Sequence, residues 1–131
     1  MKKNGIMHAE LMHQIAALGH METFLIGDAG MPIPKGVPII DLALCRGIPS
    51  FTDVLDAVLA ETKVEFYYVA EETAQQNKSL QSHLEQVLPG VPSESMPHSQ
   101  LKELSRSCKF AIRTGECSSF ANVILRAGVT F

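Results

Sequence analysis

Short apolar runs alternate with longer amphipathic segments along the whole chain. Apolar residues recur at helical spacing in residues 7–18, 50–62 and 73–88. Between these segments lie uninterrupted apolar runs of the length of a buried strand. This alternation predicts an α/β fold, a single three-layer domain over residues 1–131 whose largely parallel or mixed sheet is flanked by helices.

Four segments have the composition of strands, and residues 64–70 are the richest of them in aromatic and β-branched residues. The predicted strands are residues 23–27, 37–44, 64–70 and 109–113. Residues 91–97 contain two prolines, which cannot donate a backbone hydrogen bond, and they predict at most an edge strand or an extended link.

Residues that favour helix ends mark several boundaries. Gly19 is expected to end the first helix in a left-handed conformation. Ser50 and Asp53 predict a capping box at the start of the second helix, and Ser99 predicts the cap of a short later helix. Glu71–Glu72 follow a predicted strand, and we expect a solvated pair of acids whose side chains point to opposite sides.

Size and charge narrow the class of protein. The 131 residues, 46% of them hydrophobic, suit one compact domain. A net charge of −3 without a basic block gives no electrostatic footprint for nucleic acid or an anionic membrane. No segment approaches the ~18 consecutive apolar residues of a membrane span. We therefore expect a cytoplasmic protein whose partners are small neutral ligands or other proteins.

Cysteine and histidine spacing gives no sign of a disulfide framework or a metal site. The three cysteines form an odd number and no C-x-x-C pair, so reduced thiols are expected. The five histidines contain no H-E-x-x-H motif.

The stretch with the strongest chemical content is residues 19–34. His20 follows the first predicted helix, and Asp28 stands where the strand over residues 23–27 ends, which in open α/β sheets is where ligands bind. An imidazole can transfer protons near neutral pH, while a carboxylate can hold a hydroxyl. The alternative is structural, with His20 as a solvated helix cap and Asp28 in a turn.

A second histidine stands next to a predicted helix start. His98 precedes Ser99, so the helix dipole would keep its imidazole neutral and able to donate or accept one hydrogen bond. Lys102 lies one turn further along the same segment.

Three pieces of the chain together resemble the D-ribose pyranase family. These pieces are Leu18-Gly19-His20 with Asp28-Ala29-Gly30-Met31-Pro32-Ile33-Pro34, Ile39-Ile40-Asp41-Leu42-Ala43-Leu44 with Gly47-Ile48-Pro49-Ser50-Phe51, and Ile112-Arg113-Thr114-Gly115-Glu116-Cys117-Ser118-Ser119-Phe120-Ala121-Asn122-Val123-Ile124-Leu125. The resemblance runs from end to end and is weakest in residues 73–95. Fucose mutarotases share the Thr-Gly-Glu element but match the other pieces less well.

The resemblance implies an enzyme without cofactor or metal that interconverts the pyranose and furanose forms of ribose. It implies that His20 gives and takes the proton. The residues implied to hold sugar hydroxyls are Asp28, His98, Phe120, Ala121, Asn122 and, as a weaker candidate, Lys102. An amide such as that of Asn122 suits this task because it both donates and accepts hydrogen bonds. Arg113 and Glu116 are expected to fix the turn between them.

One residue departs from the family pattern, which has Tyr where this chain has Phe120. A hydrogen bond or proton relay through that phenol is therefore lost, although the ring can still stack on a sugar. Two alternatives stay open beside ribose: a mutarotase of another aldose such as fucose, or a sugar-binding accessory of transport that catalyses nothing.

The spacing of His20 and Asp28 sets a geometric condition. Eight residues of extended chain span about 26 Å at ~3.3 Å per residue, so the chain must bend after His20 or the two residues must meet across subunits. The resemblance implies ring-shaped homodecamers with the sugar site between neighbouring subunits, reached by the carboxyl-terminal segment of one of them.

Overall fold

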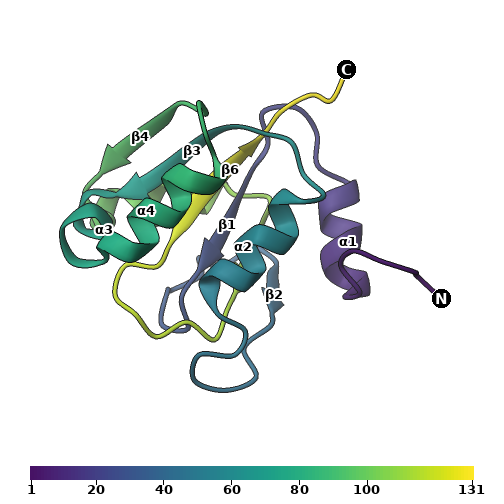
Figure 1. Ribbon diagram of the computed structural model, residues 1–131, viewed down its shortest axis with the longest axis horizontal. Helices are drawn as coiled ribbons and strands as arrows, with labels where there is room; N and C mark the ends of the chain where they lie inside the picture. The colour runs from purple at the N-terminus through teal and green to yellow at the C-terminus, as the bar shows by residue number, and fades with distance from the viewer.

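The computed structural model describes residues 1–131, which form one six-stranded mixed sheet covered by helices (Figure 1). The strands lie in the order β2-β5-β1-β6-β3-β4. Their bounds are β1 (Thr23–Gly27), β2 (Ile39–Asp41), β3 (Val64–Ala70), β4 (Ser93–Met96), β5 (Phe110–Arg113) and β6 (Val123–Ala127). The helices are α1 (Ala9–Ala16), α2 (Phe51–Leu59), α3 (Glu71–Gln76), α4 (Lys78–Val87), α5 (His98–Leu104) and the 3₁₀ turn η1 (Ser105–Ser107).

Five of the six strands run in the same direction. β1 and β2 are parallel to β5, β4 is parallel to β3, and β6 is antiparallel to both of its neighbours, β1 and β3. The carboxyl ends of five strands therefore meet at one edge of the sheet, together with the amino end of β6. This edge is the place where ligand-binding side chains are expected to gather.

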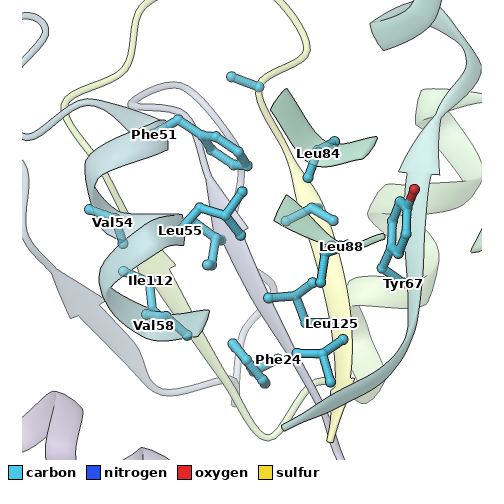
Figure 2. Close-up of a cluster of buried hydrophobic side chains, with 14 of the residues drawn as sticks. Phe24, Phe51, Val54, Leu55, Val58, Tyr67, Leu84, Leu88, Ile112 and Leu125 are labelled. Carbon is cyan, nitrogen blue, oxygen red and sulfur yellow. The ribbon is translucent and has the colours of Figure 1, made fainter. Parts of the chain in front are cut away.

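Alternating residues of each strand supply two hydrophobic clusters, one on each face of the sheet. Phe24 and Ile26 of β1 point to the face covered by α1, α2 and α4, where Phe51, Leu55 and Leu84 are fully buried (Figure 2). Leu25 between them points to the opposite face. There it packs in a smaller cluster with Leu101 of α5, Ala111 and Ile124. The predicted three-layer α/β arrangement is thus confirmed.

Several predicted boundaries are confirmed. The strands at residues 23–27 and 64–70 have the predicted limits, and residues 93–96 form an edge strand. Ser50 and Asp53 form the reciprocal capping box of α2, in which the Ser50 hydroxyl accepts from the Asp53 amide at 3.1 Å.

The first helix ends differently from the prediction. α1 stops at Ala16, and its cap Ala17 has right-handed backbone angles, so Gly19 is not a left-handed cap. The left-handed residue is instead Met21, at φ 67°. Its amide donates to the Ala127 carbonyl at 2.9 Å, which ties the chain to the end of β6 before β1 begins.

Two longer predicted elements are also wrong in extent. The strand at residues 37–44 is reduced to the three residues of β2. The helix at residues 73–88 is divided into α3 and α4 because Asn77 leaves the helical conformation, with φ −141° and ψ 63°.

The predictions for Glu71–Glu72 and for the helix cap at Ser99 are both wrong, and one contact explains why. Glu71 and Glu72 begin α3 and do not continue an extended strand. Glu72 accepts hydrogen bonds from the His98 amide at 2.9 and 3.2 Å, so its carboxylate supplies the cap that was predicted for Ser99. An anionic oxygen at a helix amino terminus is favourable because it meets free amides there.

No helix of the structure has the length and apolar character needed to cross a membrane.

The three cysteines are free thiols, and burial raises the pKa of Cys108 to about 11. Nowhere do three or more His, Cys, Asp or Glu side chains gather in a way that would hold a metal ion.

Candidate active site

Asp28 and Asn122 are 94 residues apart in sequence and form a closed pair at the carboxyl end of β1. The Asn122 Oδ1 accepts from the Asp28 amide at 3.0 Å, and its Nδ2 donates to the Asp28 carboxylate at 2.8 Å. Asn122 is fully buried just before β6. Gly27 allows this approach, since a Cβ there would stand 3.0 Å from the Asn122 Oδ1. The pair is therefore fixed by the sheet itself.

His98 completes this cluster from the first position of α5. Its Nε2 lies 3.4 Å from the Asn122 Nδ2, while its backbone is held by Glu72. Burial lowers the pKa of His98, and the positive charge of Lys102 lowers it further, against the opposing effect of the Glu72 and Asp28 carboxylates. The predicted neutral state of His98 thus agrees in direction, but burial is the main cause.

The Phe120 ring packs edge-on against His98, with ring centroids 5.1 Å apart and an angle of 90° between the ring planes. Phe120 has a left-handed backbone at φ 56°, which is uncommon for a residue with a side chain. Its carbonyl accepts from the buried Thr73 hydroxyl at 2.9 Å. Asn77 donates to the Ser119 carbonyl at 2.8 Å, so residues at the break between α3 and α4 hold this loop in place.

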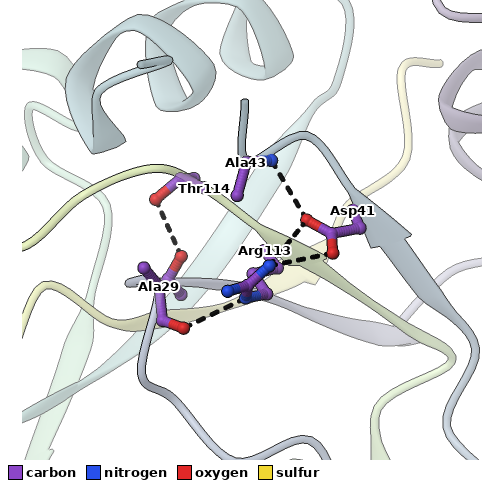
Figure 3. A network of polar contacts seen from close by, with 6 residues as sticks. Ala29, Asp41, Ala43, Arg113 and Thr114 are labelled. Carbon is purple, nitrogen blue, oxygen red and sulfur yellow. Dashed lines mark hydrogen bonds and ion pairs between the residues drawn. The ribbon is translucent and has the colours of Figure 1, made fainter. Parts of the chain in front are cut away.

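The loop after Asp28 is fixed by a second set of polar contacts (Figure 3). Arg113, at the end of β5, donates to the Ala29 carbonyl at 3.0 Å and to both carboxylate oxygens of Asp41 at 2.9 and 3.1 Å. Asp41 in turn accepts from the Ala43 amide at 3.0 Å. Arg113 thus fixes the loop after Asp28 and not, as was predicted, the turn between Arg113 and Glu116, and it gives the charge of Asp41 a partner.

Glu116 organises the connection between β5 and β6. Its carboxylate accepts from the amides of Cys117, Ser118 and Phe51 at 2.9–3.2 Å. Burial alone would raise the pKa of Glu116, but these hydrogen bonds outweigh it and lower the pKa below its usual value. Glu116 is therefore a structural anion in the turn.

The two remaining predicted binding residues, Lys102 and Ala121, differ in how deeply they are buried. Lys102 is half-buried on α5, near enough to His98 to affect its pKa. Ala121 is fully buried in the larger hydrophobic cluster, so it presents no surface to a ligand in the single subunit. The structure therefore gathers Asp28, His98, Phe120 and Asn122 directly, with Lys102 beside them.

His20 lies at the opposite end of the sheet. It precedes the amino end of β1, and its Nε2 lies 3.0 Å from the Glu65 carboxylate near the start of β3. The five residues of β1, which span roughly 16 Å at ~3.3 Å per residue, stand between His20 and Asp28. The chain does not bend back after His20, so a single subunit does not bring the predicted acid–base group to the predicted binding group.

The sequence prediction did not assign the residues that support the cluster. Glu72, Thr73 and Asn77 anchor it from α3 and the break that follows, and Glu65 contacts His20. Their partners are 26 to 47 residues away in the chain. The polar residues at 73–77, within a run of otherwise helical spacing, were the only sequence feature that pointed to these supporting contacts.

Chemically, the cluster offers hydrogen bonds of both kinds at one sheet edge. The Asp28 carboxylate accepts, a neutral imidazole at His98 donates or accepts, and the buried Asn122 amide orients the Asp28 carboxylate. An aromatic ring beside such groups is a suitable surface for the apolar face of a sugar. The arrangement fits a small, uncharged polyhydroxyl ligand.

Comparison with known proteins gives a match along nearly the whole chain. Residues 1–130 match the model of the RbsD / FucU transport protein family. The chain belongs to this family. It is 50% identical over 131 residues to a D-ribose pyranase of Symbiobacterium thermophilum, with both chains fully covered. It is 45% identical to a D-ribose pyranase of Geobacillus kaustophilus, covering all of this chain and 96% of the relative.

Two solved structures share the fold of this chain. The structure of Bacillus subtilis RbsD complexed with D-ribose superimposes with a TM-score of 0.96 at 40% identity, and both chains are fully covered. The fucose mutarotase of Streptococcus pneumoniae, solved in complex with L-fucose, gives a TM-score of 0.80 at 19% identity, over 95% of this chain and 94% of that one. The second likeness extends to the fold alone.

Proposed function

We propose that this chain is a D-ribose pyranase, an isomerase that interconverts the pyranose and furanose forms of D-ribose. The observation that carries the proposal is the Asp28–Asn122–His98 cluster, built for hydroxyl groups, in a chain half identical along its full length to a D-ribose pyranase. We also propose that residues 1–131 act as one sugar-mutarotase domain.

The reaction needs proton transfers and no redox step. A base takes the proton of the anomeric hydroxyl, the C1–O bond to the ring oxygen breaks, and that oxygen receives a proton to give the open aldehyde. Attack of a different hydroxyl on C1 then closes a ring of the other size, with the protons returned. A positioned acid–base group contributes about 10²–10⁴-fold to such steps.

In this proposal, Asp28, His98 and Lys102 hold the sugar hydroxyls and the Asn122 amide orients Asp28 for this task. The ring of Phe120 forms the wall of the site, and the buried Ala121 packs behind it. The exposed His20 is the proton donor and acceptor. Hydroxyl recognition by buried, preoriented groups is selective because a mismatched sugar leaves them unpaired.

We infer that His20 acts on the sugar bound by a neighbouring subunit of a ring-shaped homo-oligomer, a decamer by the resemblance to the ribose enzymes. Two observations support this: His20 and Asp28 lie at opposite ends of β1, and the carboxyl-terminal residues extend away from the sheet (Figure 1). Phe131 and Val129 there are exposed, as apolar residues at a subunit contact would be in an isolated chain. We propose a cytoplasmic location for this oligomer.

Proton NMR saturation transfer between the anomeric signals of D-ribose tests the function. Wild type is expected to accelerate pyranose–furanose exchange, and His20→Ala is expected to return it to the spontaneous rate. Ser99→Ala, an exposed change on α5, is the matched control. A wild-type protein that leaves ribose exchange unchanged overturns the proposal, and the same test with L-fucose then separates a mutarotase of another aldose from a protein that only binds.

A further inference from the structure

Glu65 lies between two basic side chains at the amino end of β1. Its Oε2 is 3.0 Å from the His20 Nε2, and its Oε1 forms an ion pair with the Arg126 Nε at 2.9 Å. The Glu65 and Arg126 side chains are each 27% exposed, whereas His20 is 51% exposed. The carboxylate is therefore held from behind by Arg126 and presents one oxygen to His20.

The backbone aims Glu65 at this position through an irregularity in the sheet. Val64 pairs with Ala127 and Phe66 pairs with Arg126, so Glu65 is the one extra residue opposite two consecutive residues of β6. Such bulges change the direction of a side chain and are frequent next to active sites. Gly128 provides the room, because a Cβ there would stand 3.0 Å from the Glu65 Cβ.

The other partners are fixed as well. The Arg126 guanidinium stacks on the Phe66 ring at 4.8 Å from its centroid. The segment after His20 is tied to β6 at two consecutive residues: the Met21 amide donates to the Ala127 carbonyl, and the Ala127 amide donates to the Glu22 carbonyl, each at 2.9 Å. His20 thus has a fixed backbone and one charged partner for its ring.

We propose that Glu65 is the positioning residue of His20, holding the Nε2–H so that Nδ1 is the atom that exchanges protons with the sugar. A carboxylate at neutral pH only accepts hydrogen bonds, so the His20 Nε2 must carry the proton in this contact. The lone pair of the neutral ring is then on Nδ1. This inference rests on the proposed mutarotase function and adds to it which nitrogen reacts and which residue selects it.

The same contact stabilises the intermediate charge. When Nδ1 takes the proton of the anomeric hydroxyl, the ring becomes an imidazolium, and the Glu65 carboxylate at 3.0 Å lies beside the new positive charge. Nδ1 then returns a proton to the ring oxygen as the C1–O bond breaks. The ring ends neutral, Glu65 exchanges no proton with the sugar, and no proton is gained or lost overall. Glu65 therefore acts only through His20 and does not touch the sugar.

The test compares Glu65→Ala, Glu65→Gln and the control Glu94→Gln, which removes an exposed carboxylate on β4. A hydrogen bond to a charged group contributes enough to change the rate about tenfold, and we expect this loss in Glu65→Ala at saturating ribose with unchanged apparent affinity for ribose. Glu65→Gln keeps an acceptor oxygen and is expected to lose less. Glu94→Gln is expected to match wild type.

Nitrogen-15 NMR of histidine-labelled protein reports the tautomer directly, and a general packing defect would not change it selectively. In the neutral ring, the His20 signals of wild type and Glu65→Gln are expected to show the Nε2–H form, and those of Glu65→Ala a mixture of both forms. Retained oligomer size and sheet content exclude a folding defect.

Two results would overturn the inference: an Nδ1–H tautomer of His20 in wild type, or a Glu65→Ala enzyme with the wild-type rate. Failure of the proposed function gives a different pattern. In that case wild type does not accelerate ribose exchange, while the dependence of the His20 tautomer on Glu65 still supports the contact as described.

Discussion

The two ends of β1 carry proposed functional residues in very different settings. At the carboxyl end, Asn122 is fully buried and Asp28 is tied to it by two hydrogen bonds. At the amino end, His20 is half exposed, and its ring has a single partner, Glu65. The binding end is complete within one subunit, whereas the proton-transfer end is open. Under the proposed mechanism, the groups that bind the sugar are arranged by folding alone, and catalysis is completed by assembly of the subunits.

The largest expected effect is on the rate of ribose exchange, in two variants that each remove a residue from one end of β1. His20→Ala and Asn122→Ala alone should each lose most of the acceleration, about 10²–10⁴-fold for His20. If the subunits are dissociated, mixed in equal amounts and reassembled, about a quarter of the sites should combine an intact His20 with an intact Asn122 from its neighbour. Saturation transfer on D-ribose measures the recovery. A mixture as inactive as the two parents would place both residues in the same subunit's site.

The free energy of unfolding should depend on the carboxyl end of β1 and hardly at all on the exposed His20 at its amino end. Asn122→Ala leaves the Asp28 amide and carboxylate without their buried partner, and we expect the free energy of unfolding to fall by about 1–3 kcal/mol. His20→Ala removes an exposed side chain and should change it by less than about 0.5 kcal/mol. Denaturant unfolding at one protein concentration gives both values. Equal losses in the two variants would refute the contrast.

Acid should weaken the binding end through Glu116. Its pKa is lowered in the folded protein, so the unfolded chain takes up a proton first as pH falls. The stabilisation is present above the usual pKa of about 4.5 and is lost as pH falls through the lower folded value. Glu116→Gln should therefore cost about 1 kcal/mol at pH 7. The gap to wild type should close toward pH 3 in urea unfolding across pH, and a gap independent of pH would contradict this role.

The smallest expected effect concerns His98. Its pKa is lowered by burial and by Lys102, so between the ordinary value of about 6.5 and the folded value the unfolded state binds more protons. Stability should fall as pH drops below about 6.5 and level off once the folded His98 is protonated. His98→Gln should flatten this part of the curve. Thermal unfolding at half-unit pH steps measures it, with His13→Gln, an exposed change on α1, as the control.

The parts of the fold that depend on local sequence were predictable. The capping box of Ser50 and Asp53 and the β-branched strand at residues 64–70 are local signals, and both are confirmed. The break at Asn77 was missed because its cause is not local. Its side-chain amide donates to Ser118 and Ser119, and these distant contacts override the helical periodicity.

The candidate site divides in the same way. The position of Asp28 at a strand end follows from the pattern of residues 23–27, and the position of His98 at a helix start is confirmed. Its cap could not be predicted, since Glu72 reaches it across 26 residues. Sequence spacing also set a condition on His20 and Asp28, a bend after His20 or a meeting across subunits, and the course of β1 shows that a single chain does not bring them together.

Because β6 runs antiparallel to its neighbours, the residues at its two ends belong to the two opposite edges of the sheet. Asn122 stands immediately before it and Arg126 near its end, four residues or about 13 Å apart along the strand. In the proposed ring, Asn122 serves the subunit's own sugar while Arg126, through Glu65 and His20, serves the sugar of a neighbour. β6 is thus a spacer of fixed length shared by two sites, and a shift in its register would damage both sites at once.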